Sequence, residues 1–126
     1  MKKIITTDKA PAPLGPYNQA VLVGNTLYIS GQIAIDPMSN KLILDDIESE
    51  TLQVMQNLKA VLNAADYLFE DVVKSSIFIS NMDDFLSINQ VYGSFFDNAT
   101  APARETVQVA KLPKNVNVEI SMIAVK

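Results

Sequence analysis

The sequence contains no cysteine, no histidine and no tryptophan. Without cysteine and histidine it cannot build Cys–His or Ser–His–Asp nucleophile systems, thiol redox sites, histidine-ligated haem or zinc sites. Only metal sites made entirely of oxygen ligands remain possible. Arginine is scarce too, because nine of the ten basic residues are lysines and Arg104 is the only guanidinium. Any carboxylate or phosphate held by two parallel hydrogen bonds must therefore be held at Arg104.

Positive charge is also in short supply relative to negative charge. The chain has 14 acidic and 10 basic residues, a net charge of −4 and an isoelectric point near 4.6. A phosphate backbone attracts positively charged surfaces, whereas this chain is negatively charged overall, so we expect no nucleic-acid partner. No run approaches the ~18 apolar residues of a membrane span, and residues 6–9 interrupt the apolar start before a signal peptide can form. We expect a cytoplasmic protein with no membrane contact.

What the chain does have in excess is apolar residues. They make up 48% of its 126 residues, and the mean hydropathy is +0.15. At roughly 100–200 residues per domain, this length predicts one domain over residues 1–126. Such a composition is high for a small soluble monomer, so part of the apolar surface is expected to be buried between subunits.

The hydrophobic periodicity changes along the chain and predicts both strands and helices. In chain order we expect a hairpin (19–23 and 27–30) with a type II′ turn at Gly24–Asn25, a turn (36–41), a helix of about five turns starting after Asp45, a strand (72–80), a second helix (85–96) and two strands (105–111 and 117–125). This order predicts an α+β two-layer sandwich in which two helices cover one face of the sheet.

The two predicted helices carry their own signals. In the first, Asp45 is expected to cap the N-terminus while Glu48 reaches back. The apolar residues at helical spacing are Ile47, Leu52, Met55, Leu58, Val61, Leu62 and Ala65. The second helix places Asn89 on the same stripe as Phe85 and Tyr92. An amide among aromatic side chains needs a hydrogen-bond partner, either in the core or in a site.

The alternation of side chains sorts the last two strands into faces. In the final strand Val118, Ile120, Met122 and Ala124 share an apolar face, and Glu119 lies on the other. In the strand before it, Val107 and Val109 are expected to face the helices, while Arg104 and Thr106 point away, on the same uncovered face as Glu119. Arg104 and Glu119 then form either a surface ion pair, which contributes about 0–1 kcal/mol, or a site.

A set of short segments in a fixed order runs along the whole chain: Ala10-Pro11, Gly15 to Ala20, Tyr28 to Gln32, Asn57-Leu58, Val61-Leu62, Asn89 to Tyr92, Phe95-Phe96, Pro102-Ala103-Arg104, Leu112-Pro113, Val118-Glu119-Ile120 and Ile123-Ala124. Each segment is weak alone, but the ordered set is specific. By this set the sequence resembles the RidA/YjgF family of reactive-intermediate deaminases.

The resemblance implies a chorismate-mutase-like fold, assembled as a homotrimer with active sites between subunits. It also implies hydrolysis of 2-imino acids or their enamine tautomers to 2-oxo acids and ammonia, without metal or organic cofactor. The family's carboxylate-binding arginine falls on Arg104, and the acidic residue of the hydrolytic water falls on Glu119. Its substrate-binding positions fall on Tyr17, Ser30, Gly31, Asn89 and Thr106. The alternative for the first four is structural: packing for Tyr17, a strand end for Ser30, backbone geometry for Gly31 and a core amide for Asn89.

The sequence departs from the family pattern after Arg104. Many members continue with Ser-Cys, where this chain has Glu105-Thr106. Thr106 can fill the cysteine's space and adds a hydroxyl. Glu105 points toward the helices by strict alternation, but beside Arg104 it could compete for the guanidinium. Other readings remain: a non-catalytic trimer that binds small carboxylates, or a ribonuclease, for which the acidic charge and the absent histidine leave no evident phosphate clamp or base.

Overall fold

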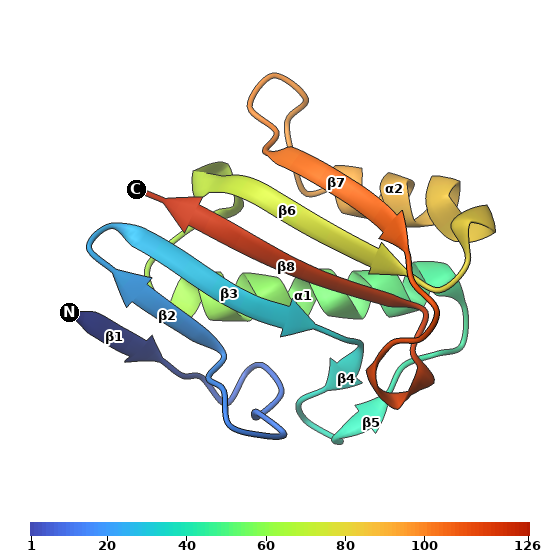
Figure 1. Ribbon diagram of the computed structural model, residues 1–126, viewed down its shortest axis with the longest axis horizontal. Helices are drawn as coiled ribbons and strands as arrows, with labels where there is room; N and C mark the ends of the chain where they lie inside the picture. Colours follow the sequence, from blue (N-terminus) through green and yellow to red (C-terminus); the bar gives the residue numbers. More distant parts are fainter.

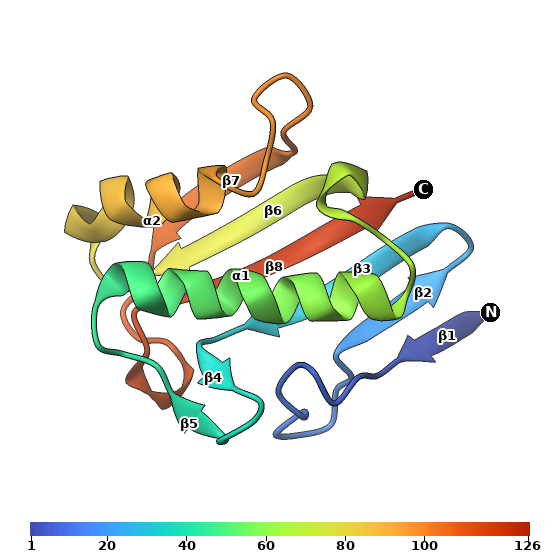
Figure 2. The ribbon, with the colours of Figure 1, turned by 180° about the vertical axis from the view of Figure 1, so that it is seen from behind.

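The computed structural model describes residues 1–126 and contains one mixed sheet with two helices on one side (Figures 1 and 2). The elements are β1 (Lys2–Ile5), β2 (Ala20–Val23), β3 (Thr26–Gln32), β4 (Ile35–Asp36), β5 (Lys41–Leu42), α1 (Ile47–Ala64), β6 (Val72–Ile79), α2 (Phe85–Gly93), β7 (Ala103–Gln108) and β8 (Val118–Val125). The predicted α+β sandwich is confirmed. Neither helix is both long and apolar enough to cross a membrane.

The six-stranded sheet has the order β1-β2-β3-β8-β6-β7. All neighbouring strands are antiparallel except β6 and β7, which run parallel. The long chain from β6 through α2 to β7 makes this parallel pairing possible, because it returns the chain to the end at which β6 began. β7 is thereby an edge strand, with α2 lying over it and β6 (Figure 2).

The predicted hairpin is β2–β3, and its two-residue turn has a positive φ only at Gly24, as a type II′ turn requires. Two features escaped prediction. Residues 2–5 form edge strand β1, and residues 35–42 contain the short β4–β5 ladder in addition to the expected turn. Both are very short or polar, so their periodicity is too weak to identify them.

Helix α1 differs from expectation in its cap and in its buried face. The N-cap is Asp46 instead of Asp45, and its carboxylate accepts from Ser49 N at 2.7 Å. Two adjacent aspartates satisfy the same local rule, so the sequence signal does not distinguish them. Leu52 is largely exposed, whereas the carboxylate of Glu50 is fully buried and accepts from the backbone of Asn117 and Val118.

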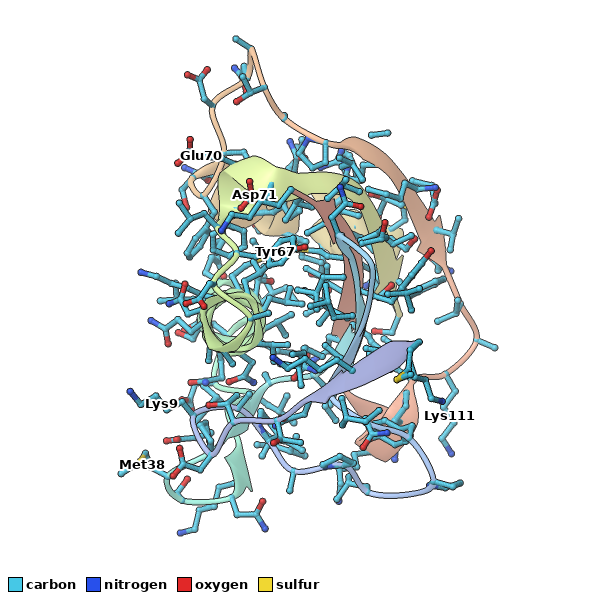
Figure 3. All side chains as sticks on the ribbon, turned by 90° about the vertical axis from the view of Figure 1, so that its left-hand side faces the viewer. Lys9, Met38, Tyr67, Glu70, Asp71 and Lys111 are labelled. Carbon is cyan, nitrogen blue, oxygen red and sulfur yellow. The ribbon has the colours of Figure 1, made fainter.

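The core lies between α1, α2 and the sheet, and the predicted inward face of β8 is confirmed. Val118, Ile120, Met122 and Ala124 are all buried. Viewed along the sheet, α1 lies on one side of the strands; buried Tyr67 lies between the layers, and Lys111 lies on the opposite side of the sheet (Figure 3).

The predicted face assignment of β7 is wrong. Arg104 pairs with buried Ser75, and Thr106 with buried Ile77, so both point toward the helices. Val107 is level with Phe78 and Glu119 on the other face, and it is 40% exposed. The physical reason is that β7 is an edge strand. Its parallel register with β6 determines which of its side chains face the helices. Where a strand contacts little of the core, its apolar residues do not indicate which side is buried.

Glu105 also lies on the opposite face from the one predicted. It forms an ion pair with Lys74 (2.9 Å) and accepts from the Ser76 hydroxyl, both on β6. The hydrogen bond from Ser76 and the contact with Lys74 lower the pKa of Glu105. The carboxylate therefore faces away from the Arg104 guanidinium and does not compete for it.

The face of the sheet opposite the helices, here called the uncovered face, carries many apolar side chains. By register this face comprises Lys2, Ile4, Val21, Val23, Thr26, Tyr28, Lys74, Ser76, Phe78, Ala103, Glu105, Val107, Glu119, Ser121, Ile123 and Val125. Tyr28 lies within this face, between Val21 and Ile123, and is 50% exposed. Contiguous exposed apolar surface of this kind is typical of an interaction surface.

Candidate functional site

The predicted site residues fall into two groups on opposite faces of the sheet. Arg104, Asn89 and Thr106 lie on the side of α2, whereas Glu119, Gly31 and Tyr17 lie on the other side and line one pocket. Arg104 and Glu119 form no ion pair within the chain, because the sheet separates them. The surface ion pair considered from the sequence is therefore absent.

The first group is built around Arg104 at the start of edge strand β7. Its Nη1 donates to Asn89 Oδ1 at 2.5 Å. The guanidinium also rests on the aromatic platform, formed by Phe85 and Tyr92 of α2, with its Cζ 5.7 Å and 5.2 Å from the two ring centroids. Stacking and one hydrogen bond fix its plane and leave its other N–H groups without protein partners. The partner expected for the Asn89 amide is thus Arg104.

A pocket of about 310 Å³ opens beside Arg104. Its lining comprises Asn89, Tyr92, Gly93, Phe96, Asn98, Ala101, Pro102 and Arg104. The loop between α2 and β7, which projects from the body of the protein in Figure 1, supplies part of this wall. A single cation with free donors on an otherwise uncharged wall can bind a small carboxylate.

Thr106 lies two residues further along the same face of β7. Its Oγ1 is buried and has no hydrogen-bond partner. An unpaired buried hydroxyl is costly, and such groups are uncommon in folded proteins. Thr106 does not belong to the lining of the pocket beside Arg104, so its hydroxyl is enclosed within the protein and does not face that pocket.

The second group surrounds Glu119 of β8, in a pocket of about 260 Å³ that we call the Glu119 pocket. Its lining comprises Pro11, Ala12, Leu14, Tyr17, Gln19, Gly31, Gln32, Ile33, Ile35, Pro113 and Glu119. Partial burial raises the pKa of the Glu119 carboxyl, and no opposite charge offsets this effect. A carboxyl with a raised pKa can accept or deliver a proton closer to neutral pH than an ordinary glutamate.

Backbone irregularity in β3 gives Glu119 its room. The pairing of β3 with β8 shifts between Ile29 and Gln32, so Ser30 and Gly31 form a bulge. A β-carbon on Gly31 would lie 2.9 Å from Glu119 Cδ, which is too close. Ser30 is engaged structurally, since its hydroxyl donates to Asn18 O at 2.6 Å.

The proline-rich loop over residues 10–17 forms the outer wall of the Glu119 pocket. Buried Gln19 holds this loop, because its Nε2 donates to the carbonyls of Ala10 (3.2 Å) and Pro11 (2.9 Å). Tyr17 is half exposed, and its hydroxyl accepts from Leu14 N at 3.2 Å. The ring is therefore held at the rim of the pocket.

The sequence reasoning missed three contributors to these groups. Phe85 and Tyr92 were assigned only to the helix stripe, although their i and i+7 positions flank Asn89 and place all three on one face. Ser75 was not identified; its signal is a serine among inward-facing isoleucines. No group of three or more carboxylates lies close enough together to hold a metal ion.

Comparisons with known proteins cover the whole chain. A family model described as Endoribonuclease L-PSP matches residues 7–126. A RutC family protein of Saccharolobus solfataricus is 49% identical over 126 residues, covering 100% of this chain and 99% of the relative. A protein of Dermatophagoides farinae named 2-iminobutanoate/2-iminopropanoate deaminase is 50% identical over 124 residues, covering 98% and 96%.

Two solved structures show the same fold. A candidate endoribonuclease of Thermotoga maritima superposes with a TM-score of 0.97 at 49% identity, covering 100% of this chain and 98% of that one. The TdcF protein of E. coli, solved with bound serine, gives a TM-score of 0.92 at 41% identity and covers 98% of both chains. The fold, the family match over residues 7–126 and the relatives agree, and the chain belongs to the RidA/YjgF family.

Proposed function

We propose that the protein hydrolyses reactive 2-imino acids, such as 2-iminobutanoate and 2-iminopropanoate, to 2-oxo acids and ammonia. The observation that carries this proposal is the single guanidinium, held on the aromatic platform with donors free toward a pocket. The deaminase name of a relative that is 50% identical over nearly the whole chain supports the same chemistry.

Arg104 binds the substrate carboxylate through two parallel charge-assisted hydrogen bonds, which orients the imine carbon. Glu119 orients a water molecule and takes its proton as the oxygen bonds to that carbon. Glu119 then passes this proton to the imine nitrogen as the C=N double bond opens, which gives a carbinolamine. The hydroxyl proton of the carbinolamine moves through Glu119 to the same nitrogen, the C–N bond breaks, and ammonia leaves as the carbonyl forms. Because an imine carbon is already electrophilic, positioning and proton transfer suffice. The position of Tyr17 at the rim of the Glu119 pocket suits a contact with the same ligand.

Since the two groups lie on opposite faces of the sheet, the proposed reaction requires Arg104 of one subunit to meet Glu119 of another. We propose a homotrimer with its active sites at the subunit boundaries. Its support is the apolar content of the uncovered face and the position of Arg104 on an edge strand, from which a neighbouring copy can be reached.

A coupled assay tests the proposal. A pyridoxal-phosphate threonine dehydratase generates the imine, and formation of 2-oxobutanoate is followed with and without this protein, with semicarbazide as a competing trap. We expect faster 2-oxo acid release and less semicarbazone. Arg104→Lys should lose most of the effect, because an ammonium cannot supply a planar fork. Unchanged 2-oxo acid release in the presence of wild-type protein excludes the activity.

The alternative of a non-catalytic carboxylate-binding protein rested on competition between Glu105 and the substrate. Glu105 instead contacts Lys74 and Ser76 and does not reach Arg104, so the structure offers no support for that alternative. Calorimetric binding of 2-oxobutanoate without turnover would still favour it. RNA cleavage has less support, because the net charge is −4 and no histidine is present. Cleavage that survives repurification and is lost in Glu119→Gln would reverse this ranking.

A further inference from the structure

Ser75 is an anomaly in the inward face of β6. The neighbouring inward positions are Ile77 and Ile79, and all three residues are fully buried. A hydroxyl placed among apolar side chains destabilises the fold unless it is hydrogen-bonded. Ser75 Oγ accepts from the Tyr92 hydroxyl at 2.8 Å, which is its only side-chain partner.

Tyr92 connects this serine to Arg104. Its hydroxyl reaches Ser75 on β6, while the face of its ring lies 5.2 Å from Arg104 Cζ on β7. Ser75 and Arg104 are themselves register partners across the β6–β7 pairing. Each of the three residues thus contacts the other two. The hydrogen bond to Ser75 fixes the position of the Tyr92 ring, and the ring supports the guanidinium of Arg104.

Two further contacts hold Tyr92 and Arg104 in place. The ring of Tyr92 packs against Phe96 at 4.8 Å between centroids, and Asn89 on the same helix accepts from Arg104 Nη1. A shift of the Tyr92 ring would therefore move the guanidinium relative to the pocket beside it. Ligand affinity and turnover are sensitive to such shifts, since a misplacement of ~1 Å can reduce a rate ~100-fold.

We propose that Ser75 and Tyr92 are positioning residues for Arg104: their hydroxyl contact sets the ring on which the guanidinium rests and hence the orientation in which it receives a carboxylate. The identity of that carboxylate rests on the proposed function, but the positioning itself does not. The two can be tested separately because the chain has only one arginine.

The test compares Ser75→Ala and Tyr92→Phe with the matched control Tyr67→Phe. Tyr67 is a second buried tyrosine. Its hydroxyl donates to Asn25 O at 2.7 Å, in the turn between β2 and β3, and it makes none of the contacts of Arg104. Removing either tyrosine hydroxyl should lower the thermal midpoint, so stability alone does not distinguish the roles. The distinguishing readout is the Nε–Hε signal of Arg104 in a ¹H–¹⁵N spectrum, which is unambiguous in a protein with a single arginine.

We expect Ser75→Ala and Tyr92→Phe to move this signal toward the value of a free arginine and to weaken 2-oxobutanoate binding by about tenfold. In Tyr67→Phe the signal and the affinity should stay unchanged. In an Arg104→Lys background, Ser75→Ala should lower the thermal midpoint but not reduce affinity further, because the group it positions is gone.

An unshifted Arg104 signal in both variants overturns the proposal, as does an equal shift in Tyr67→Phe. If Ser75→Ala fails to fold, Tyr92→Phe decides alone, since it keeps the ring and removes only the hydroxyl. If the wild-type protein neither turns over imines nor binds 2-oxobutanoate, the proposed function fails while the Nε–Hε signal still decides the positioning role.

Discussion

The carboxylate of Glu119 occupies the space that a side chain on Gly31 would fill. A β-carbon at Gly31 would lie 2.9 Å from Glu119 Cδ and 3.1 Å from its Cγ. Gly31 belongs to the bulge in β3, and Glu119 lies on the neighbouring strand β8. The glycine is therefore required by the position of the carboxylate and not by an unusual backbone angle, since its φ is not positive.

Gly31→Ala should displace the Glu119 carboxylate from the pocket. Because the displaced atoms belong to the end of a flexible side chain, we expect a change of less than about 1 kcal/mol in the free energy of unfolding. Imine hydrolysis should fall by at least about tenfold, since the group that we propose to orient the water is moved. Urea unfolding and the coupled assay measure the two effects. Full activity in Gly31→Ala would mean that the position of Glu119 does not matter.

Protonation of Glu119 should affect stability in a defined direction. Burial raises the pKa of its carboxyl above its ordinary value near 4.5. Below pH 4.5 the group is protonated whether the chain is folded or unfolded. As the pH rises, the unfolded chain releases this proton first, so the wild type loses stability until the pH passes the pKa of the folded state.

Glu119→Gln removes this dependence, so its stability relative to wild type should increase from pH 4.5 upward and then level off. Urea unfolding of both proteins between pH 4 and pH 8 measures the difference, in which contributions from other carboxyls such as Glu105 cancel. A difference that stays constant with pH, or that narrows as the pH rises, contradicts the raised pKa.

The uncovered face should mediate self-association. Tyr28→Glu places a charge at the centre of this face, on a residue that is 50% exposed in the single chain, so the fold should survive. We expect wild-type protein to be a trimer and Tyr28→Glu to be monomeric and inactive in light scattering and the coupled assay. Leu86→Glu is the control, because Leu86 is 79% exposed on α2, on the other side of the sheet. A trimeric Tyr28→Glu would place the interface elsewhere.

Glu50 should be essential for stability. Its two carboxylate oxygens accept from Asn117 N (2.7 Å), Asn117 Nδ2 (2.7 Å) and Val118 N (3.2 Å), and the residue is fully buried. In Glu50→Gln an amide N–H₂ replaces one acceptor and meets donors. We expect a loss of about 2–3 kcal/mol in the free energy of unfolding, measured in urea. The control is Glu48→Gln. Glu48 lies two residues earlier in α1, on a different side of the helix, and is exposed, so this change should affect stability little.

Much of the architecture could be predicted from local patterns. The hairpin turn at Gly24, the five-turn helix and the alternation of β8 each follow from the propensities and spacing of neighbouring residues. The cap of α1 could not be predicted because two aspartates stand side by side. Strand β1 was missed because it has only four residues, the first two of which are lysines, and an edge strand needs no strong pattern.

The sequence by itself determined which groups are available: one guanidinium, no histidine or cysteine, and an ordered set of segments that identifies the family. It also predicted that Asn89 needs a partner. Only the tertiary structure decided that the partner is Arg104, and that Arg104 and Glu119 lie on opposite faces of the sheet. The reason is that the faces of β7 depend on its register with β6 and on its contacts with side chains of α2. These long-range contacts cannot be predicted from the alternation of residues in a short edge strand.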